Sequence, residues 1–132
     1  MIRYTVDTGV FSLYFARDER IKPYFDEIAD HGGGYVSSVN LAEFFNLTCR
    51  SLGKEVALHR YHQLGELFDT VPADEELSMK AGLFKCRSPG LSLADCYAAA
   101  VATMTDSQLL TTDGTLARSR LVKTRHFAIP EK

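Results

Sequence analysis

Short β-rich segments alternate with helical patterns along almost the whole of this 132-residue chain. The first segment, residues 2–6, contains β-branched and aromatic residues, and an apolar helical stretch follows it directly. Each later β-rich segment is again separated from the next by a helical pattern. Because a helix between two strands normally joins them in parallel, this order predicts an α/β fold, with a mainly parallel central sheet inside a three-layer α/β/α sandwich.

The alternation predicts the following elements. The strands are expected at 2–6, 34–37, 69–72, 108–112 and 125–128, the last of them at a sheet edge, and the helices at 9–16, 19–31, 39–52, 54–68, 74–86, 92–105 and 115–120. No linker, internal repeat or low-complexity block interrupts them, and 132 residues suffice for one hydrophobic core. We therefore expect residues 1–132 to form a single domain.

Composition and segment lengths argue against a membrane protein. No apolar stretch is long enough to span a bilayer, and no charged-then-apolar leader opens the chain, so we expect a cytoplasmic protein. Cys49, Cys86 and Cys96 are odd in number and form no CxxC pair. They are expected to be free thiols in a reducing compartment.

Four acidic residues occupy positions where an open α/β sheet binds its ligands. Asp7 and Asp113 each follow a predicted strand directly. Glu43 lies one turn into the helix after the second strand, and Asp95 lies at the third position of a helix with a 3.6-residue apolar period. Because the carboxyl ends of parallel strands meet at one edge of the sheet, we expect the four carboxylates to converge there.

Each acid taken alone has a simpler explanation. Asp7 could cap the helix that follows it, and Ser92-x-x-Asp95 matches a capping box. Asp113 begins an Asp-Gly turn dipeptide, and Glu43 could be a solvated charge paired with an arginine along its helix. The coincidence of four acids at carboxyl-side junctions is what favours a functional site over four separate local roles.

Four motifs around these acids resemble the PIN-domain nucleases, and in particular the small single-domain toxins of VapC type. They are Thr5-Val6-Asp7-Thr8, Val39-Asn40-Leu41-Ala42-Glu43-Phe44, Leu91-Ser92-Leu93-Ala94-Asp95-Cys96-Tyr97-Ala98-Ala99-Ala100 and Leu110-Thr111-Thr112-Asp113-Gly114. The resemblance covers nearly the whole chain in the right order and implies a metal-dependent endoribonuclease. One departure is that Gly114-Thr115-Leu116 lacks the further acid or Asn and the aromatic often found there, so whether one or two metal ions bind is open.

Electrostatics explains why four such acids would need a cation. Two unit charges about 4 Å apart repel by roughly 4 kcal/mol at an effective dielectric near 20, so clustered carboxylates are costly unless protonated or neutralised. Oxygen ligands without His or Cys favour Mg²⁺, or Mn²⁺, over Zn²⁺. The cation would lower the pKa of a water molecule that then attacks the phosphodiester.

We assign roles within this mechanism as follows. Asp7 and Asp95 are expected to be the main direct ligands, and Glu43 and Asp113 to act through water, one of them orienting the attacking molecule. Thr8, Ser92 and Thr112 could support the site with their hydroxyl groups, with capping and turn roles as the alternatives.

The expected partners are an RNA substrate, a cognate antitoxin and a second copy of the chain. The 15 basic and 17 acidic residues give a net charge of −2, unlike a passive nucleic-acid binder. The 14 Phe and Tyr residues, together with the resemblance, suggest a homodimer. An antitoxin would place an arginine among the acids and a helix in an apolar groove, whose candidate residues are Leu41, Phe44, Phe45, Leu47, Tyr61 and Leu64. The alternative is an RNA-processing or RNA-binding component with a vestigial site.

Overall fold

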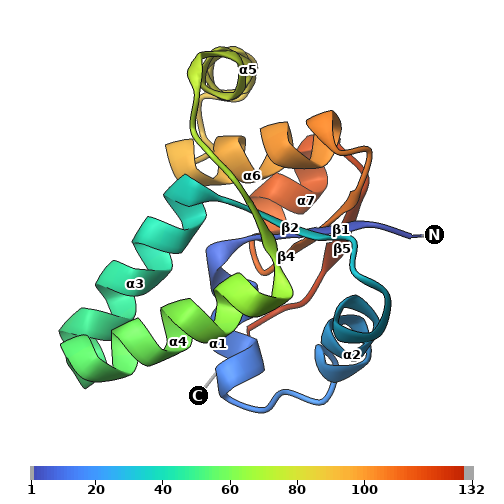
Figure 1. Ribbon diagram of the computed structural model, residues 1–132. Coiled ribbons are helices and arrows are strands. Elements are labelled where there is room, and N and C mark those ends of the chain that lie inside the picture. Colours follow the sequence, from blue (N-terminus) through green and yellow to red (C-terminus); the bar gives the residue numbers. More distant parts are fainter. Residues whose placement is uncertain (1, 130–132) are drawn as a thin grey trace.

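Five strands form one fully parallel sheet in the order β3-β2-β1-β4-β5 (Figure 1). In this computed structural model, which describes residues 2–129, the strands are β1 (Tyr4–Val6), β2 (Gly34–Ser37), β3 (Asp69–Val71), β4 (Gln108–Thr111) and β5 (Thr124–His126). The first strand is therefore central, and β3 and β5 are the edges. The predicted parallel sheet is confirmed.

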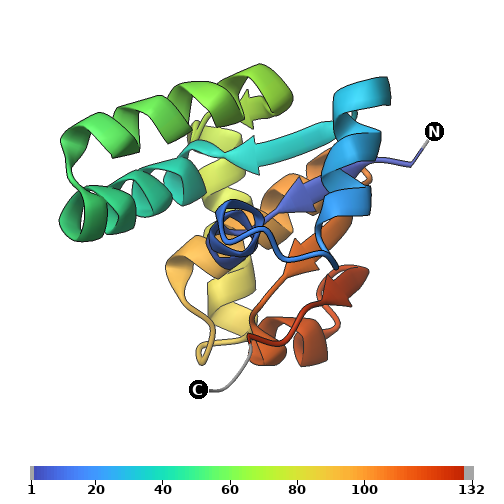
Figure 2. The ribbon, with the colours of Figure 1, turned by 90° about the horizontal axis from the view of Figure 1, so that it is seen from below.

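Helices cover both faces of this sheet, which confirms the three-layer α/β/α sandwich (Figure 1). They are α1 (Thr8–Phe15), α2 (Lys22–His31), α3 (Ser38–Leu52), α4 (Lys54–Leu67), α5 (Glu75–Arg87), α6 (Leu93–Met104) and α7 (Gly114–Ser119). In Figure 1, α6 and α7 lie on one face, α1 and α2 on the other, and α5 stacks outside α6. Figure 2 shows α3 and α4 side by side as a hairpin at the flank of the sheet.

Side-chain alternation along the strands divides the core into two clusters. Val36 and Leu110 pack with α1 and α2 on one face, in a cluster that contains Phe11 and Phe25. Leu109, the neighbour of Leu110, joins the opposite cluster with α5 and α6. Successive side chains of a strand point to opposite faces, so β2 and β4 supply side chains to both cores and are held between two helical layers.

Polar caps place the helices directly after the strands. Ser37, the last residue of β2, accepts a hydrogen bond from the Asn40 amide at 3.0 Å and caps α3, so no loop separates the strand from the helix. Asp74 caps α5 in the same way through the Leu77 amide.

Most boundaries differ from the predicted ones by one or two residues, and α2 differs by three. The helix begins at Lys22 instead of residue 19, with Pro23 in its first turn. Proline lacks an amide hydrogen and is tolerated where no helical bond is needed, and the Asp18 carboxylate holds the preceding turn by accepting from the Arg20 amide. At the chain ends, β1 begins at Tyr4, and β5 spans Thr124–His126 instead of 125–128.

The aromatic residues that suggested a dimer are mostly buried or partly buried within the chain itself. Phe11 and Phe84 are buried, and Tyr14 and Phe15 are partly buried against the first cluster. Among the groove candidates, Leu41, Phe44 and Leu64 are buried and pack in the core, where α3 and α4 meet the flank of the sheet. Phe45, Leu47 and Tyr61 remain at the surface.

None of the helices within residues 2–129 has the length and apolar character needed to cross a membrane.

Candidate active site

Asp7 is a buried carboxylate at the carboxyl end of the central strand. Its side chain is 2% exposed and caps α1 by accepting from the Val10 amide at 3.1 Å. The same carboxylate accepts from the Thr111 hydroxyl and from the Thr112 amide, at 3.2 Å for the latter. The capping role considered for Asp7 is therefore real, and the acid additionally ties the end of β1 to the end of β4.

Asp113 and Asp95 lie beside each other at the starts of α7 and α6. Asp113 caps α7 by accepting from the Leu116 amide at 3.0 Å. Asp95 donates its own amide to the Ser92 hydroxyl at 3.1 Å, which is the first half of a capping box. The Asp95 and Asp113 carboxyl groups are close enough to shift each other's pKa, so the environment of Asp95 includes more than a cap.

The three carboxyl groups shift one another's pKa values. Burial, opposed by the three donated hydrogen bonds, raises the pKa of Asp7 to about 6. Burial first, and then the hydrogen bond and charge of Asp113, raise the pKa of Asp95 to about 7, with a further contribution from Asp7. Burial also opposes ionisation of Asp113, but the Asp95 carboxyl, two backbone amides and Arg118 together hold its pKa below the usual value. Three acids therefore share one electrostatic environment.

Glu43 does not join this group. It is exposed on α3, five residues after the helix begins, and it makes no side-chain hydrogen bond or ion pair with any residue between 2 and 129. The pairing with an arginine along the same helix, for which Arg50 is the candidate, is likewise not formed within residues 2–129. The structure thus brings together Asp7, Asp95 and Asp113, and the role assigned to Glu43 stays a prediction.

The donor chemistry of this edge fits a hard divalent cation, although its geometry does not enclose one. Across residues 2–129, no set of three or more His, Cys, Asp and Glu side chains is arranged tightly enough to hold a metal ion. The three acids nevertheless provide only oxygen donors, and the raised pKa values of Asp7 and Asp95 indicate that the protein compensates the negative charge of these two acids poorly. Asp7, Asp95 and Asp113 are therefore the residues that would hold Mg²⁺ or Mn²⁺.

Asn40 is a buried polar residue that the sequence analysis did not single out. Its side-chain amide donates to the Thr8 hydroxyl at 3.2 Å and to the Ala94 carbonyl at 3.3 Å, and its side-chain oxygen accepts from Ser37. Thr8 and Ala94 are the chain neighbours of Asp7 and Asp95. Asn40 therefore joins the starts of α1, α3 and α6, and its only sequence signal was a polar residue in an otherwise apolar helical stretch.

The expected supporting hydroxyl groups divide into different roles. Thr8 bonds to Asn40, and Ser92 caps α6 and helps to keep Asp95 ionised. Thr112 contributes its backbone amide to Asp7, while its side chain packs over Gly9. A Cβ added at Gly9 would lie 2.0 Å from the Thr112 hydroxyl oxygen, so α1 approaches the turn after β4 closely because residue 9 has no side chain.

Comparison with known proteins agrees with this geometry. The PIN domain model matches residues 4–120, which include all four predicted acids. The chain belongs to the PIN domain family. Curated protein sequences give no match to it.

Solved structures share the fold of this PIN domain at low sequence identity. VapBC2 from Rickettsia felis, bound to a DNA fragment from its promoter, gives a TM-score of 0.79 at 15% identity over 96% of this chain and 99% of that chain. DNA-bound VapBC from Salmonella typhimurium gives 0.78 at 16% identity over 96% and 98%. VapC20 from Mycobacterium tuberculosis, described as a sarcin-ricin loop cleaving toxin, gives 0.70 at 20% identity over 91% and 97%.

The raised pKa values predict that the metal-free PIN domain becomes less stable as the pH rises. A carboxyl group with a higher pKa in the folded state stabilises the protein below its unfolded pKa, and this contribution is lost as the pH rises through the folded value. We therefore expect the free energy of unfolding in EDTA to fall between about pH 4 and 7, by on the order of 2–3 kcal/mol from Asp7 alone. Urea titrations across this range measure it, and Asp95→Asn should show a shallower dependence. If the free energy of unfolding of Asp95→Asn depended on pH as steeply as that of the parent protein, or more steeply, the claim that the acids share one electrostatic environment would be wrong.

Removing the Asn40 side chain should weaken the PIN domain. Asn40→Ala loses two donated hydrogen bonds and leaves the Ala94 carbonyl without its side-chain donor, for an expected cost of about 2–3 kcal/mol in the free energy of unfolding. Asn46→Ala, on the exposed side of the same helix, is the matched control and should change stability by less than about 0.5 kcal/mol. Equal effects of the two substitutions would show that Asn40 does not join the three helices energetically.

Gly9→Ala should destabilise the protein although alanine normally favours a helix. The added methyl group meets Thr112, so we expect a loss of about 1–3 kcal/mol instead of a gain. In a Thr112→Ala background the clashing hydroxyl is absent, and the same substitution should cost clearly less. Thermal unfolding of the four proteins of this double-mutant cycle gives the coupling, and a coupling near zero would exclude the close contact.

Proposed function

We propose that this PIN domain is a metal-dependent endoribonuclease and acts as the toxin of a toxin-antitoxin pair. The observation that carries the proposal is the convergence of Asp7, Asp95 and Asp113, from three different segments, on one edge of the sheet with raised pKa values for two of them. Membership of the PIN domain family and a fold shared with VapC toxins support the same conclusion.

The chain's own residues divide the work of this site. The three donors to Asp7 fix the orientation of its carboxylate, so that it presents a preorganised negative charge. Asp95 and Asp113 are close enough to share a proton when no cation is bound, and they would both ionise to hold one. A bound Mg²⁺ or Mn²⁺ would supply Lewis acidity toward the phosphodiester and toward an attacking water molecule. Glu43, exposed and free to move, is proposed to orient that water.

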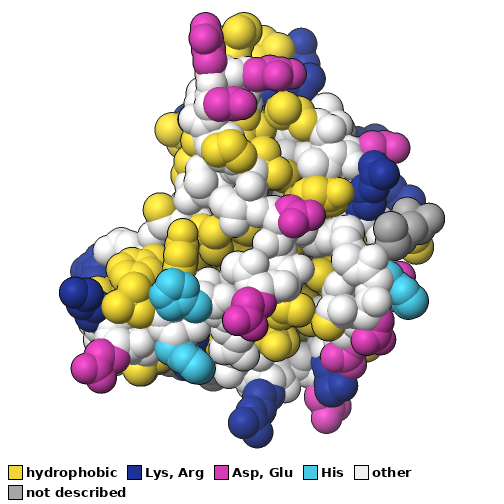
Figure 3. Space-filling model, in the orientation of Figure 1, with side chains coloured by type: hydrophobic (Ala, Val, Ile, Leu, Met, Phe, Trp, Pro, Cys, Tyr) yellow, Lys and Arg dark blue, Asp and Glu magenta, His cyan; other side chains and the backbone are white. Residues whose placement is uncertain are grey.

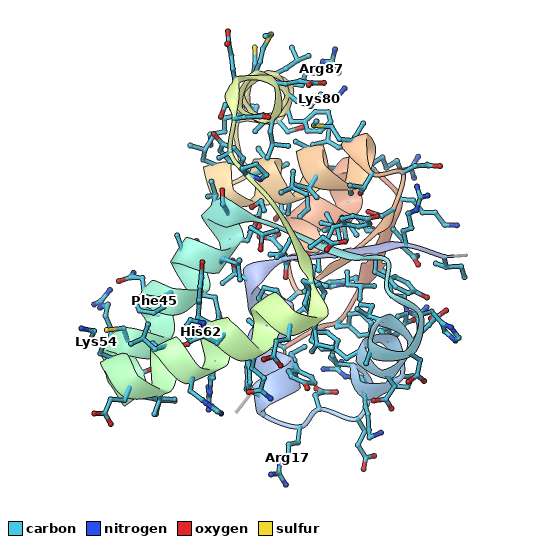
Figure 4. The ribbon with its side chains drawn as sticks, viewed as in Figure 1. Arg17, Phe45, Lys54, His62, Lys80 and Arg87 are labelled. Atoms are coloured by element: carbon cyan, nitrogen blue, oxygen red, sulfur yellow. The ribbon has the colours of Figure 1, made fainter. Side chains whose placement is uncertain are left out.

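An antitoxin is the proposed regulator of this site. Exposed apolar residues gather on the α3–α4 hairpin, among them Leu47 and Tyr61, and Figure 3 shows hydrophobic side chains over this part of the surface. Figure 4 places Phe45 and His62 on the same hairpin, with Lys54 near its tip. A cavity of about 300 Å³ lies between α1, α3 and α4 and is lined by Phe15, Phe44, Leu47 and Arg60 among others. An amphipathic antitoxin helix fits such a surface, and an arginine beyond it would reach the acids.

A homodimer is proposed on different residues from those first expected. Met79, Leu83 and Met104 are at least 42% exposed and line a shared apolar hollow between α5 and α6. Large flexible side chains at an apolar surface of this kind are typical of protein interfaces. The proposed cytoplasmic location is the compartment in which such a toxin would meet its RNA.

The second candidate function is an RNA-processing or RNA-binding component with a weak site. The exposed position of Glu43, which makes no side-chain hydrogen bond with any residue between 2 and 129, is the observation that favours it. Such a protein would bind RNA without cutting it at a useful rate, so the same assay distinguishes the two functions.

Cleavage of total cellular RNA by the purified protein tests the proposal. We expect cuts in the presence of Mg²⁺ or Mn²⁺ that disappear in EDTA. We also expect Asp95→Asn to lower the rate of cleavage by at least about 100-fold, because it replaces a charged ligand with a neutral side chain of similar shape. Asp95 is preferred to Asp7 because an asparagine at position 7 keeps only one acceptor oxygen, so its NH2 group would face at least one of the three donors and weaken the fold.

The matched control is Asp69→Asn, the same substitution on an exposed acid at the start of β3 and so at the opposite end of the sheet. It should leave cleavage unchanged. Metal-independent cleavage, or full activity in a folded Asp95→Asn protein, would refute the assigned mechanism. Tight RNA binding without any cleavage would favour the second candidate.

A further inference from the structure

The segment after Asp113 carries an uncompensated positive charge that differs from the rest of the chain. Residues 114–129 contain four Lys or Arg residues and no Asp or Glu, in a protein whose net charge is −2. The basic residues are Arg118, Arg120, Lys123 and Arg125. The segment forms α7 and the edge strand β5, which continue directly from the acid that begins them.

One of these cations, Arg118, turns back toward the acids. It lies one helical turn after Gly114, and its Nη1 atom is 2.9 Å from where a Cβ at residue 114 would stand. The guanidinium therefore occupies the space that a side chain next to Asp113 would fill. Its charge is close enough to Asp113 to favour the ionised carboxylate.

His126 lies against the same space from the edge strand. Its Cε1 atom is 3.6 Å from the same Cβ position, and its Nε2 atom is 3.3 Å from the Thr112 carbonyl oxygen. A carbonyl oxygen only accepts, so this contact assigns the hydrogen to Nε2 and fixes the ring beside Arg118. The register that pairs Thr111 with His126 brings the ring there.

No ion pair within residues 2–129 accounts for the position of Arg118. Within residues 2–129 no carboxylate oxygen lies within 4 Å of its guanidinium, whereas Arg20 pairs with Asp18 at 2.8 Å and Arg60 lies over the Phe15 ring at 4.6 Å. An arginine fork matches two oxygens of a phosphate group and keeps its charge at every relevant pH. Beside acids that would hold a cation, this guanidinium is in a position to bind a phosphate group of a nucleic-acid backbone.

We propose that Arg118, supported by His126, binds a phosphate group of the RNA strand adjacent to the one that is cut. This inference rests on the proposed nuclease function and adds the residue that positions the strand. A cation-filled acidic site and a neighbouring guanidinium would contact successive phosphates, which sets the direction in which the strand crosses the carboxyl edge of the sheet.

The salt dependence of RNA binding tests the contact without requiring cleavage. Binding of a fluorescein-labelled 12-nucleotide single-stranded RNA is measured in EDTA at several salt concentrations, in the Asp95→Asn background. Each phosphate contact contributes about −0.7 to the slope of log K against log salt for a single strand. We expect Arg118→Gln to make the slope less steep by about 0.7 and to weaken binding several-fold, and Arg118→Lys to keep the slope with weaker binding.

The control is Lys123→Gln, which removes an exposed cation of the same segment just before β5, away from the carboxyl edge. It should leave the slope unchanged. An unchanged slope in folded Arg118→Gln, an equal change in the Lys123 variant, or no measurable binding by the parent protein would overturn the proposal. If Arg118→Gln altered only the metal requirement of cleavage, the residue would tune Asp113 and the phosphate contact would be wrong.

The outcomes also separate this inference from the proposed function. In the cleavage assay with the otherwise unchanged protein, Arg118→Gln should raise KM about fivefold or more with a smaller change in kcat. If the protein cut no RNA but Arg118→Gln still made the slope of log K against log salt less steep, the nuclease function would be refuted and the Arg118 contact supported. If the protein cut RNA but Arg118→Gln left the slope unchanged, the nuclease function would be supported and the Arg118 contact refuted.

Discussion

The buried carboxylate of Asp7 is the constraint around which the rest of the site is arranged. A charge removed from water is unfavourable unless the protein supplies donors, and Asp7 receives three from α1 and from the end of β4. These bonds fix the end of the central strand against its neighbour. They also leave the carboxylate only partly compensated, because burial still raises its pKa.

The parallel sheet explains why the other acids lie at the same edge as Asp7. All its strands are parallel, so Val6, Ser37 and Thr111 end β1, β2 and β4 at one edge. The helices that start there carry Asp7, Asp95 and Asp113 in or before their first turns. Local capping and a shared site are therefore not alternatives at Asp7 and Asp113, since the same carboxyl groups cap a helix and are coupled to another acid.

The clustered acids make the metal-free protein less stable at neutral pH, where the proposed cation would bind. Two of the three acids have raised pKa values, which means that the metal-free folded state is strained by their ionisation at neutral pH. A ligand that binds only the folded state with its acids ionised recovers this free energy. Asn40 limits the freedom of the cluster, because it holds the starts of three helices together by hydrogen bonds that carry no charge.

The sequence by itself determined the parallel α/β/α fold, the positions of the strands to within about two residues, and the convergence of Asp7, Asp95 and Asp113. These follow from periodicity and from the rule that parallel strands share a carboxyl edge. Only the tertiary structure decided that Asn40 links the helices, that Thr112 packs on Gly9, that Glu43 stays exposed and that Arg118 and His126 both lie beside Gly114. Such contacts join residues distant in the chain and depend on side-chain direction and on how closely elements approach, neither of which leaves a local pattern in the sequence.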